Sequence, residues 1–125
     1  MQEIRDRLGP SGFLRAEEET VLGLGIKRGI IASGDSVVLS QRAMHFLKEI
    51  GNIVHLQADP CVLEHRIGTK PDRGLIIQAG QTLDDLFRKR DPLYRHYADQ
   101  TIRTDLNSPD RCLQLILNRF FPIEV

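Results

Sequence analysis

The sequence predicts an α/β protein in which a parallel β-sheet is covered by helices on both faces. Short apolar runs rich in β-branched residues, at 29–39 and 53–57, alternate with segments whose apolar residues recur at helical spacing. A further short strand is expected at 101–105. Strands joined by a helix lie parallel, because the helix returns the chain to the same end of the sheet. The 125 residues suit one domain, which we place at 1–125.

Helical spacing of apolar residues predicts the helices of the first half. Residues 1–8 have helical character, which ends at the breaker cluster of residues 9–12. Residues 13–22 form a helix with a wet acidic face that stops at Gly23. Another helix covers residues 41–50 and stops at Gly51.

Capping residues predict the helices of the second half. Asp59 and Pro60 begin a helix that runs to about residue 67. Thr82 and Asp85 resemble a capping box, and we expect Pro92 to interrupt the helix that they begin. The final helix starts at residues 108–109, and its apolar positions are expected to face the core: Cys112, Leu113, Ile116, Leu117 and Phe120. Residues 68–80 lack periodicity and are expected to form a mobile or ligand-covering loop.

Composition narrows the classes of function. The 17 basic and 17 acidic residues cancel, which argues against nucleic acid or an anionic membrane as a partner. No run of eighteen apolar residues is present, so we expect a cytoplasmic protein. Thirteen of the seventeen basic residues are Arg, which is compatible with a small anionic ligand and also with biased codon usage. Cys61 and Cys112 are expected to be reduced core residues, and four scattered histidines predict no metal site.

An ordered series of short motifs stands at measured distances around the small-residue loop of residues 33–36. The series consists of Phe-Leu-Arg-Ala-Glu-Glu-Glu at 13–19, Ala-Ser-Gly-Asp-Ser-Val-Val at 32–38, Arg-Gly-Leu-Ile at 73–76, Arg-Asp-Pro-Leu-Tyr at 90–94 and Tyr-Ala-Asp at 97–99. Together these motifs resemble the shikimate kinases, a family of small P-loop phosphotransferases. The resemblance covers about residues 2–118. It implies a three-layer αβα fold and transfer of the ATP γ-phosphate to the 3-hydroxyl of shikimate, in the aromatic amino acid pathway.

The resemblance assigns substrate-binding roles to three residues. Arg15 and Arg90 would hold the carboxylate of shikimate, which a guanidinium meets through two parallel hydrogen bonds. Glu18, one turn from Arg15, would hold that guanidinium in place. Gly34 would let backbone N–H groups approach the substrate. The alternatives are an exposed Arg15–Glu18 helix pair, an ordinary helix arginine at 90 and a turn glycine.

It also assigns two arginines to the nucleotide. Arg66 would stack against the adenine of ATP, and Arg73, on a lid of about residues 68–80, would reach the transferring phosphate as a catalytic arginine finger. Alternatively, both are solvated charges beside a loop.

The sequence also departs from the family pattern. It contains no Gly-x-x-x-x-Gly-Lys-Ser/Thr, and the family's first strand, first helix and second strand have no counterpart in it. We therefore expect that ATP and Mg²⁺ are not bound productively and that two sheet edges need a partner strand, pair directly or remain unpaired. Asp35 occupies a position where the family has Gly, and it would repel phosphate, point away or contact Mg²⁺. Gly74, in place of the lid Pro, would loosen the lid.

Three hypotheses follow for function. The chain is part of a shikimate kinase whose phosphate-binding segment is encoded upstream. Alternatively, it is a pseudokinase remnant that binds a small carboxylate through Arg15 and Arg90, or that pairs with another chain through its sheet edge. A decaying gene whose product folds poorly is the third.

Overall fold

The computed structural model describes residues 2–68 and 82–123. Its elements, in chain order, are α1 (Gln2–Leu22), the short 3₁₀ helix η1 (Asp35–Leu39), α2 (Gln41–Ile50), β1 (Val54–Gln57), α3 (Pro60–Gly68), α4 (Leu83–Tyr97), β2 (Gln100–Arg103) and α5 (Pro109–Phe120). None of the helices in this part of the chain is both long enough and apolar enough to cross a membrane.

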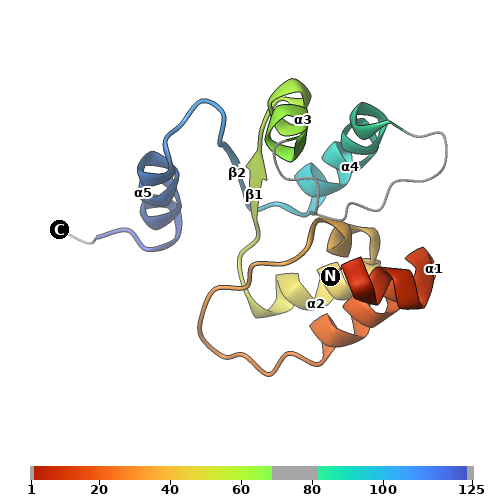
Figure 1. The fold of residues 1–125 in the computed structure, drawn as a ribbon. Helices are drawn as coiled ribbons and strands as arrows, with labels where there is room; N and C mark the ends of the chain where they lie inside the picture. The colour runs from red at the N-terminus through yellow and green to blue at the C-terminus, as the bar shows by residue number, and fades with distance from the viewer. Residues whose placement is uncertain (1, 69–81, 124–125) are drawn as a thin grey trace.

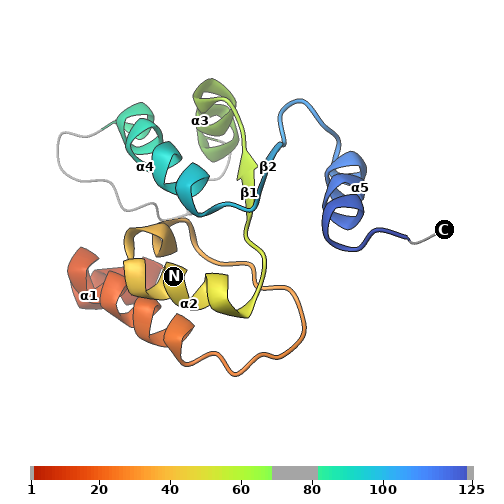
Figure 2. The same ribbon diagram turned by 180° about the vertical axis from the view of Figure 1, so that it is seen from behind.

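The sheet confirms the predicted α/β class. β1 and β2 pair in parallel, with Val54 opposite Gln100 and Gln57 opposite Arg103. Helix α5 lies on one side of the two strands, and α3 and α4 lie on the other (Figures 1 and 2). Helices α1 and α2 and the η1 turn form a second group, which lies below α4 and the strands in Figure 1. The strands are thus covered on both faces, as the alternation of strands and helices predicts.

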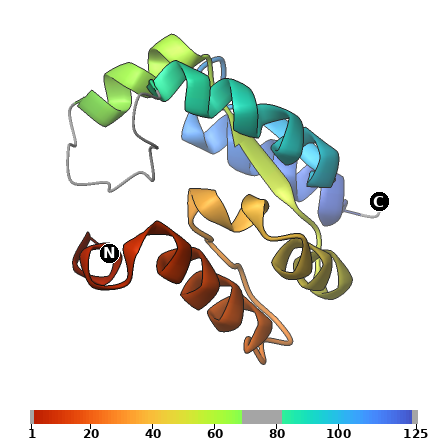
Figure 3. The same ribbon diagram turned by 90° about the vertical axis from the view of Figure 1, so that its right-hand side faces the viewer.

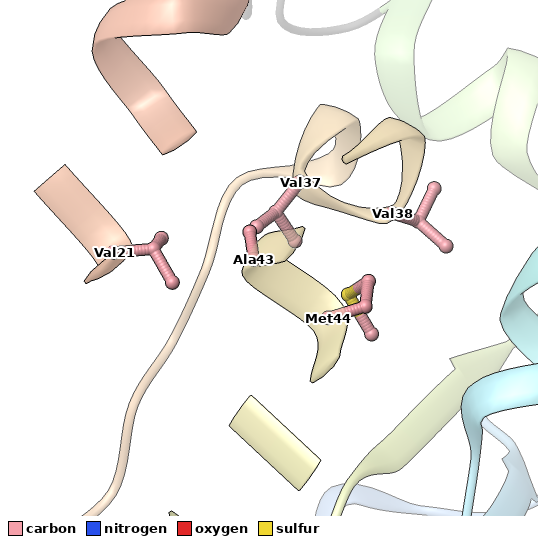
Figure 4. Packing of buried hydrophobic residues seen from close by; sticks show 5 residues of the cluster. All are labelled: Val21, Val37, Val38, Ala43 and Met44. Atoms are coloured by element: carbon pink, nitrogen blue, oxygen red, sulfur yellow. The ribbon is translucent and has the colours of Figure 1, made fainter. Parts of the chain in front are cut away.

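A core cluster joins α1, η1 and α2. Its buried members are Val21, Val37, Val38, Ala43 and Met44 (Figure 4). Tyr94 and Tyr97 of α4 pack against this cluster, so the second half of the chain is held to the first. Apolar burial of this kind contributes roughly 25 cal/mol per Å² removed from water.

The predicted strand at 29–39 is wrong. Residues 30–34 are loop, residues 35–39 form η1, and the Ile30 side chain is 96% exposed. A strand needs a neighbour to satisfy its backbone N–H and C=O groups, and the described residues supply no strand beside this segment. Val37 and Val38 are still buried, but through the 3₁₀ turn.

The predicted break near residue 9 is confirmed, whereas the predicted interruption at Pro92 is wrong. Gly9 has φ +70° and separates α1 into two helical pieces that meet at a sharp bend, drawn in red in Figure 3. Helix α4 instead continues through Pro92. Pro removes one backbone hydrogen bond, but the ion pair Asp91–Arg95 spans Pro92 and the pair Asp84–Arg88 supports the preceding turn.

Three predicted core residues are exposed. Cys112 is buried as expected, but Leu113 and Leu117 of the same helix are exposed, because α5 packs against β2 at the margin of a two-stranded sheet. Cys61, also expected in the core, is exposed on α3.

Candidate functional site

Residues 34–36, where the preceding loop passes into η1 and which we call the 34–36 loop, are fastened to α1 by Glu17. The Ser36 hydroxyl donates to Glu17 Oε1 at 2.6 Å, and Ser36 itself is buried. A Cβ added at Gly34 would lie 2.7 Å from Glu17 Oε2, closer than such atoms approach. A residue with a Cβ at position 34 would therefore have to displace the Glu17 carboxylate.

The same loop is fastened to α4 through Asp35. Arg90 Nη1 donates to Asp35 Oδ2 in an ion pair, and the Tyr94 hydroxyl donates to the Asp35 carbonyl at 2.7 Å. Arg90 and Tyr94 stand one turn apart, so both reach Asp35 from one helix face. The Arg90 side chain is only 4% exposed, whereas that of Asp35 is 46% exposed. Burial raises the pKa of Tyr94, which keeps its hydroxyl a donor.

Arg15 lies at a shallow hollow between α1 and η1. The hollow has a volume of about 250 Å³, and Ser36 and Ser40 line it together with Arg15. Glu18 does not hold the Arg15 guanidinium: its carboxylate accepts from the Ser40 hydroxyl at 2.6 Å and from Arg42 at 3.3 Å. The described residues that line the hollow do not include Arg90. Arg15 and Arg90 thus approach the 34–36 loop from two helices without sharing one cavity.

Arg66 lies at the end of α3 and bonds to the end of β2. Its Nη1 donates to Thr104 Oγ1 at 3.1 Å and its Nη2 donates to the Thr104 carbonyl at 3.3 Å. Arg73 and residues 69–80 of the expected lid lie outside the described residues.

Sequence reasoning missed Glu17, Tyr94 and the pairing of Asp35 with Arg90. The spacing of Arg90 and Tyr94 on one helix face was a usable signal for a shared partner. Glu17 carried no such signal, because Glu18 and Glu19 beside it have the same side chain.

The described residues form an α/β protein with a parallel two-stranded sheet, which is consistent with part of a P-loop kinase-like αβα fold. The family model described as Shikimate kinase matches residues 1–120. The chain therefore belongs to the shikimate kinase family.

Curated relatives agree with this assignment. The chain is 35% identical over 122 residues to the shikimate kinase of Pseudomonas paraeruginosa, which covers 93% of this chain and 69% of the relative. It is 33% identical over 119 residues to that of Chromohalobacter salexigens, covering 93% of this chain and 66% of the relative. A match to the shikimate kinase of Thiobacillus denitrificans is 36% identical over 101 residues, covering 77% and 54%. The chain thus spans about two thirds of the first two relatives.

Family membership implies ATP and Mg²⁺ in general, but the residues that the structure describes do not fit a nucleotide phosphate chain or its metal ion. The 125 residues include no phosphate-binding Gly-x-x-x-x-Gly-Lys-Ser/Thr loop. Within residues 2–68 and 82–123, no group of three His, Cys, Asp or Glu could hold a metal ion. Arg66 is held on Thr104. No step through ATP or Mg²⁺ is assigned to these residues.

Proposed function

We propose that this chain is the acceptor-binding part of a shikimate kinase and that Arg15 and Arg90 hold the carboxylate of shikimate. The observation that carries this role is the loop at residues 34–36, which Glu17 and Arg90 fasten between two helices. A loop held from both sides is a pre-organised wall for a small ligand, and arginine suits a carboxylate. Shikimate is the substrate that the family name implies.

We also propose that this chain alone does not transfer phosphate. Phosphoryl transfer depends on positioning and charge stabilisation, most of which the phosphate-binding loop and its metal supply. Loss of one pre-organised donor costs roughly 3 kcal/mol of transition-state stabilisation, so loss of the whole loop leaves no useful rate.

Titration calorimetry with shikimate tests the binding role. We expect weak binding to the unmodified chain and binding weaker by about tenfold or more to Arg15→Met, since a charged hydrogen bond is worth about 1.5–3 kcal/mol. Arg111→Met, on the distant helix α5, is the matched control and leaves the affinity unchanged. No heat at millimolar shikimate, in the unmodified chain and also in Asp35→Asn, where the carboxylate that pairs with Arg90 is removed, would rule out the role. ATP turnover by this chain in a coupled assay would contradict its proposed inactivity.

A second candidate function, pairing with another chain, is favoured by the free edge of β1. The carbonyls of Ile53 and Gln57 accept hydrogen bonds from the β2 side, at 2.8 Å from Asp99 and 2.7 Å from Thr104. The backbone N–H and C=O groups of Val54 and Leu56, the alternate residues of this strand, point to the opposite edge. The described residues place no strand at that edge. Leu56 is 58% exposed. An edge of this kind is a template for a partner strand.

Sedimentation equilibrium tests this second candidate. Leu56→Lys puts a charge on the edge strand and should weaken self-association, whereas Leu113→Lys on α5 should leave it unchanged. A monomer at every concentration of the unmodified chain would speak against self-pairing.

A further inference from the structure

We propose that Asp35 is an internal substitute for the ligand carboxylate: it occupies Arg90 and thereby determines how tightly this site binds small carboxylates. This inference rests on the proposed function, because it deepens the role given there to Arg90. It concerns the contact between η1 and α4, which the family resemblance leaves unassigned.

The first step is that the buried, charged side chain of Arg90 requires an anionic partner. Its side chain is 4% exposed, and its charged group is paired with the carboxylate of Asp35. A buried guanidinium without an anionic partner is strongly unfavourable, so this position always needs one. Asp35 supplies the same chemical group that a carboxylate ligand would bring.

The second step is the fixed position of Asp35. Its carbonyl accepts from the Tyr94 hydroxyl at 2.7 Å, and the next residue, Ser36, is bonded to Glu17 at 2.6 Å. The backbone on which the carboxylate is carried is therefore tied to α4 and to α1. A tethered group acts at an effective concentration in the millimolar range or above, so a free carboxylate at lower concentration does not displace it.

The third step is access. The Asp35 side chain is 46% exposed, so an external ligand can approach the pair from solvent and the displaced carboxylate can return to water. Two carboxylates on one guanidinium would repel each other. Ligand and Asp35 therefore exclude one another, and removing the charge of Asp35 should admit the ligand.

The experiment compares Asp35→Asn with the unmodified chain, using shikimate and cyclohexanecarboxylate, a carboxylate without hydroxyl groups, as probes. We expect Asp35→Asn to bind both probes about tenfold or more tightly, the size of one charge-assisted contact. Adding Arg90→Met to Asp35→Asn should abolish this gain. Asp84→Asn, which removes an acid from an exposed pair on α4, is the matched control and should not change either affinity.

Asp35→Asn leaves a buried arginine poorly paired and could fold badly. Thermal unfolding is therefore also measured for a second variant, Asp35→Gly, which leaves space for the probe beside Arg90. Cyclohexanecarboxylate should raise the melting temperature of Asp35→Gly and leave that of the unmodified chain unchanged, since a ligand that binds only the folded state stabilises it. If the Asp35–Arg90 ion pair has only a structural role, Asp35→Asn and Asp35→Gly will be destabilised and cyclohexanecarboxylate will not raise their melting temperatures. That result would overturn the proposal.

The probes separate this inference from the proposed function. A gain for cyclohexanecarboxylate without one for shikimate supports the role of Asp35 and contradicts shikimate as the ligand. Equal shikimate affinities with and without Asp35, both lost in Arg90→Met, overturn the role of Asp35 and leave the proposed function standing. Failure of every variant to bind either probe overturns both.

Discussion

Gly34 and Glu17 are the pair of residues on which the loop at 34–36 depends most directly. Gly34→Ala would place a methyl group 2.7 Å from Glu17 Oε2 and push that carboxylate away from Ser36. We expect a loss of about 1–2 kcal/mol in the free energy of unfolding, the value of a hydrogen bond to a charged group, measured by urea denaturation.

The two sites should also be coupled. In a Glu17→Ala background the methyl group meets no carboxylate, so Gly34→Ala should cost little there. Glu19→Ala, an exposed change on the same helix, provides the background in which the full cost persists. Additive losses for Glu17→Ala and Gly34→Ala would show that the two residues do not meet.

His55 should make stability depend on pH. Its ring stacks on Tyr94 at a centroid distance of 4.9 Å, and its Nδ1 is buried without a hydrogen-bond partner in the described part of the chain. Burial lowers the pKa of His55 below 6.5, although Asp91 opposes the shift. The unfolded chain therefore binds the proton more readily, and stability falls as the pH drops through about 6.5 towards the folded pKa.

His55→Phe keeps the stacked ring and removes the titration. Its unfolding free energy should lose this acid-sensitive component between about pH 7.5 and about pH 5.5. His45→Gln, at an exposed position of α2, should leave that component in place. An unchanged pH profile in His55→Phe would assign the effect to other groups.

At the scale of elements, Ser40 caps α2 and also bonds that helix to α1. Its side chain accepts from the Ala43 N–H at the start of α2, and it donates to Glu18 of α1 at 2.6 Å. Ser108 caps α5 in the same way by accepting from the Arg111 N–H, but among the described residues its side chain bonds to no other helix. Ser40→Ala should therefore cost about 1 kcal/mol more than Ser108→Ala, which should itself cost about 1 kcal/mol. Equal losses of stability for the two variants in thermal denaturation would show that the Ser40–Glu18 bond does not stabilise the contact between α1 and α2.

Capping chemistry also explains which elements the sequence predicts well. The helices capped by Thr82 and Ser108 begin where those residues predict, because each cap acts within three residues of its partner. The segment at 29–39 is not a strand, because pairing depends on a neighbour that local sequence does not contain. Asp35 and Arg90 are 55 positions apart. The sequence therefore indicates that each residue is of interest, but it does not predict that the two form an ion pair.

At the scale of the whole molecule, the chain exposes more surface than its mass requires. A compact monomer of 14.2 kDa is expected to expose about 6,800 Å², whereas this chain exposes 9330 Å². Part of the excess is apolar: large exposed side chains include Ile30, Leu56, Leu106, Phe121 and Ile123. Taking about 20,600 Å² for the unfolded chain, folding buries about a fifth less surface than in a compact protein.

The heat capacity of unfolding should record this deficit, because it scales with the apolar surface that folding removes from water. Compact proteins have about 12–15 cal/mol/K per residue, and we expect this chain to lie about a fifth or more below that range. Scanning calorimetry provides the measurement, at a concentration where sedimentation shows a monomer. The urea m-value of the same sample should be low in proportion, since it depends on the same area. A heat capacity of unfolding within the range of compact proteins, measured on a monomer, would mean that the chain covers in solution the surface that this fold leaves open. A value within that range only for a dimer would mean that a second copy of the chain covers this surface.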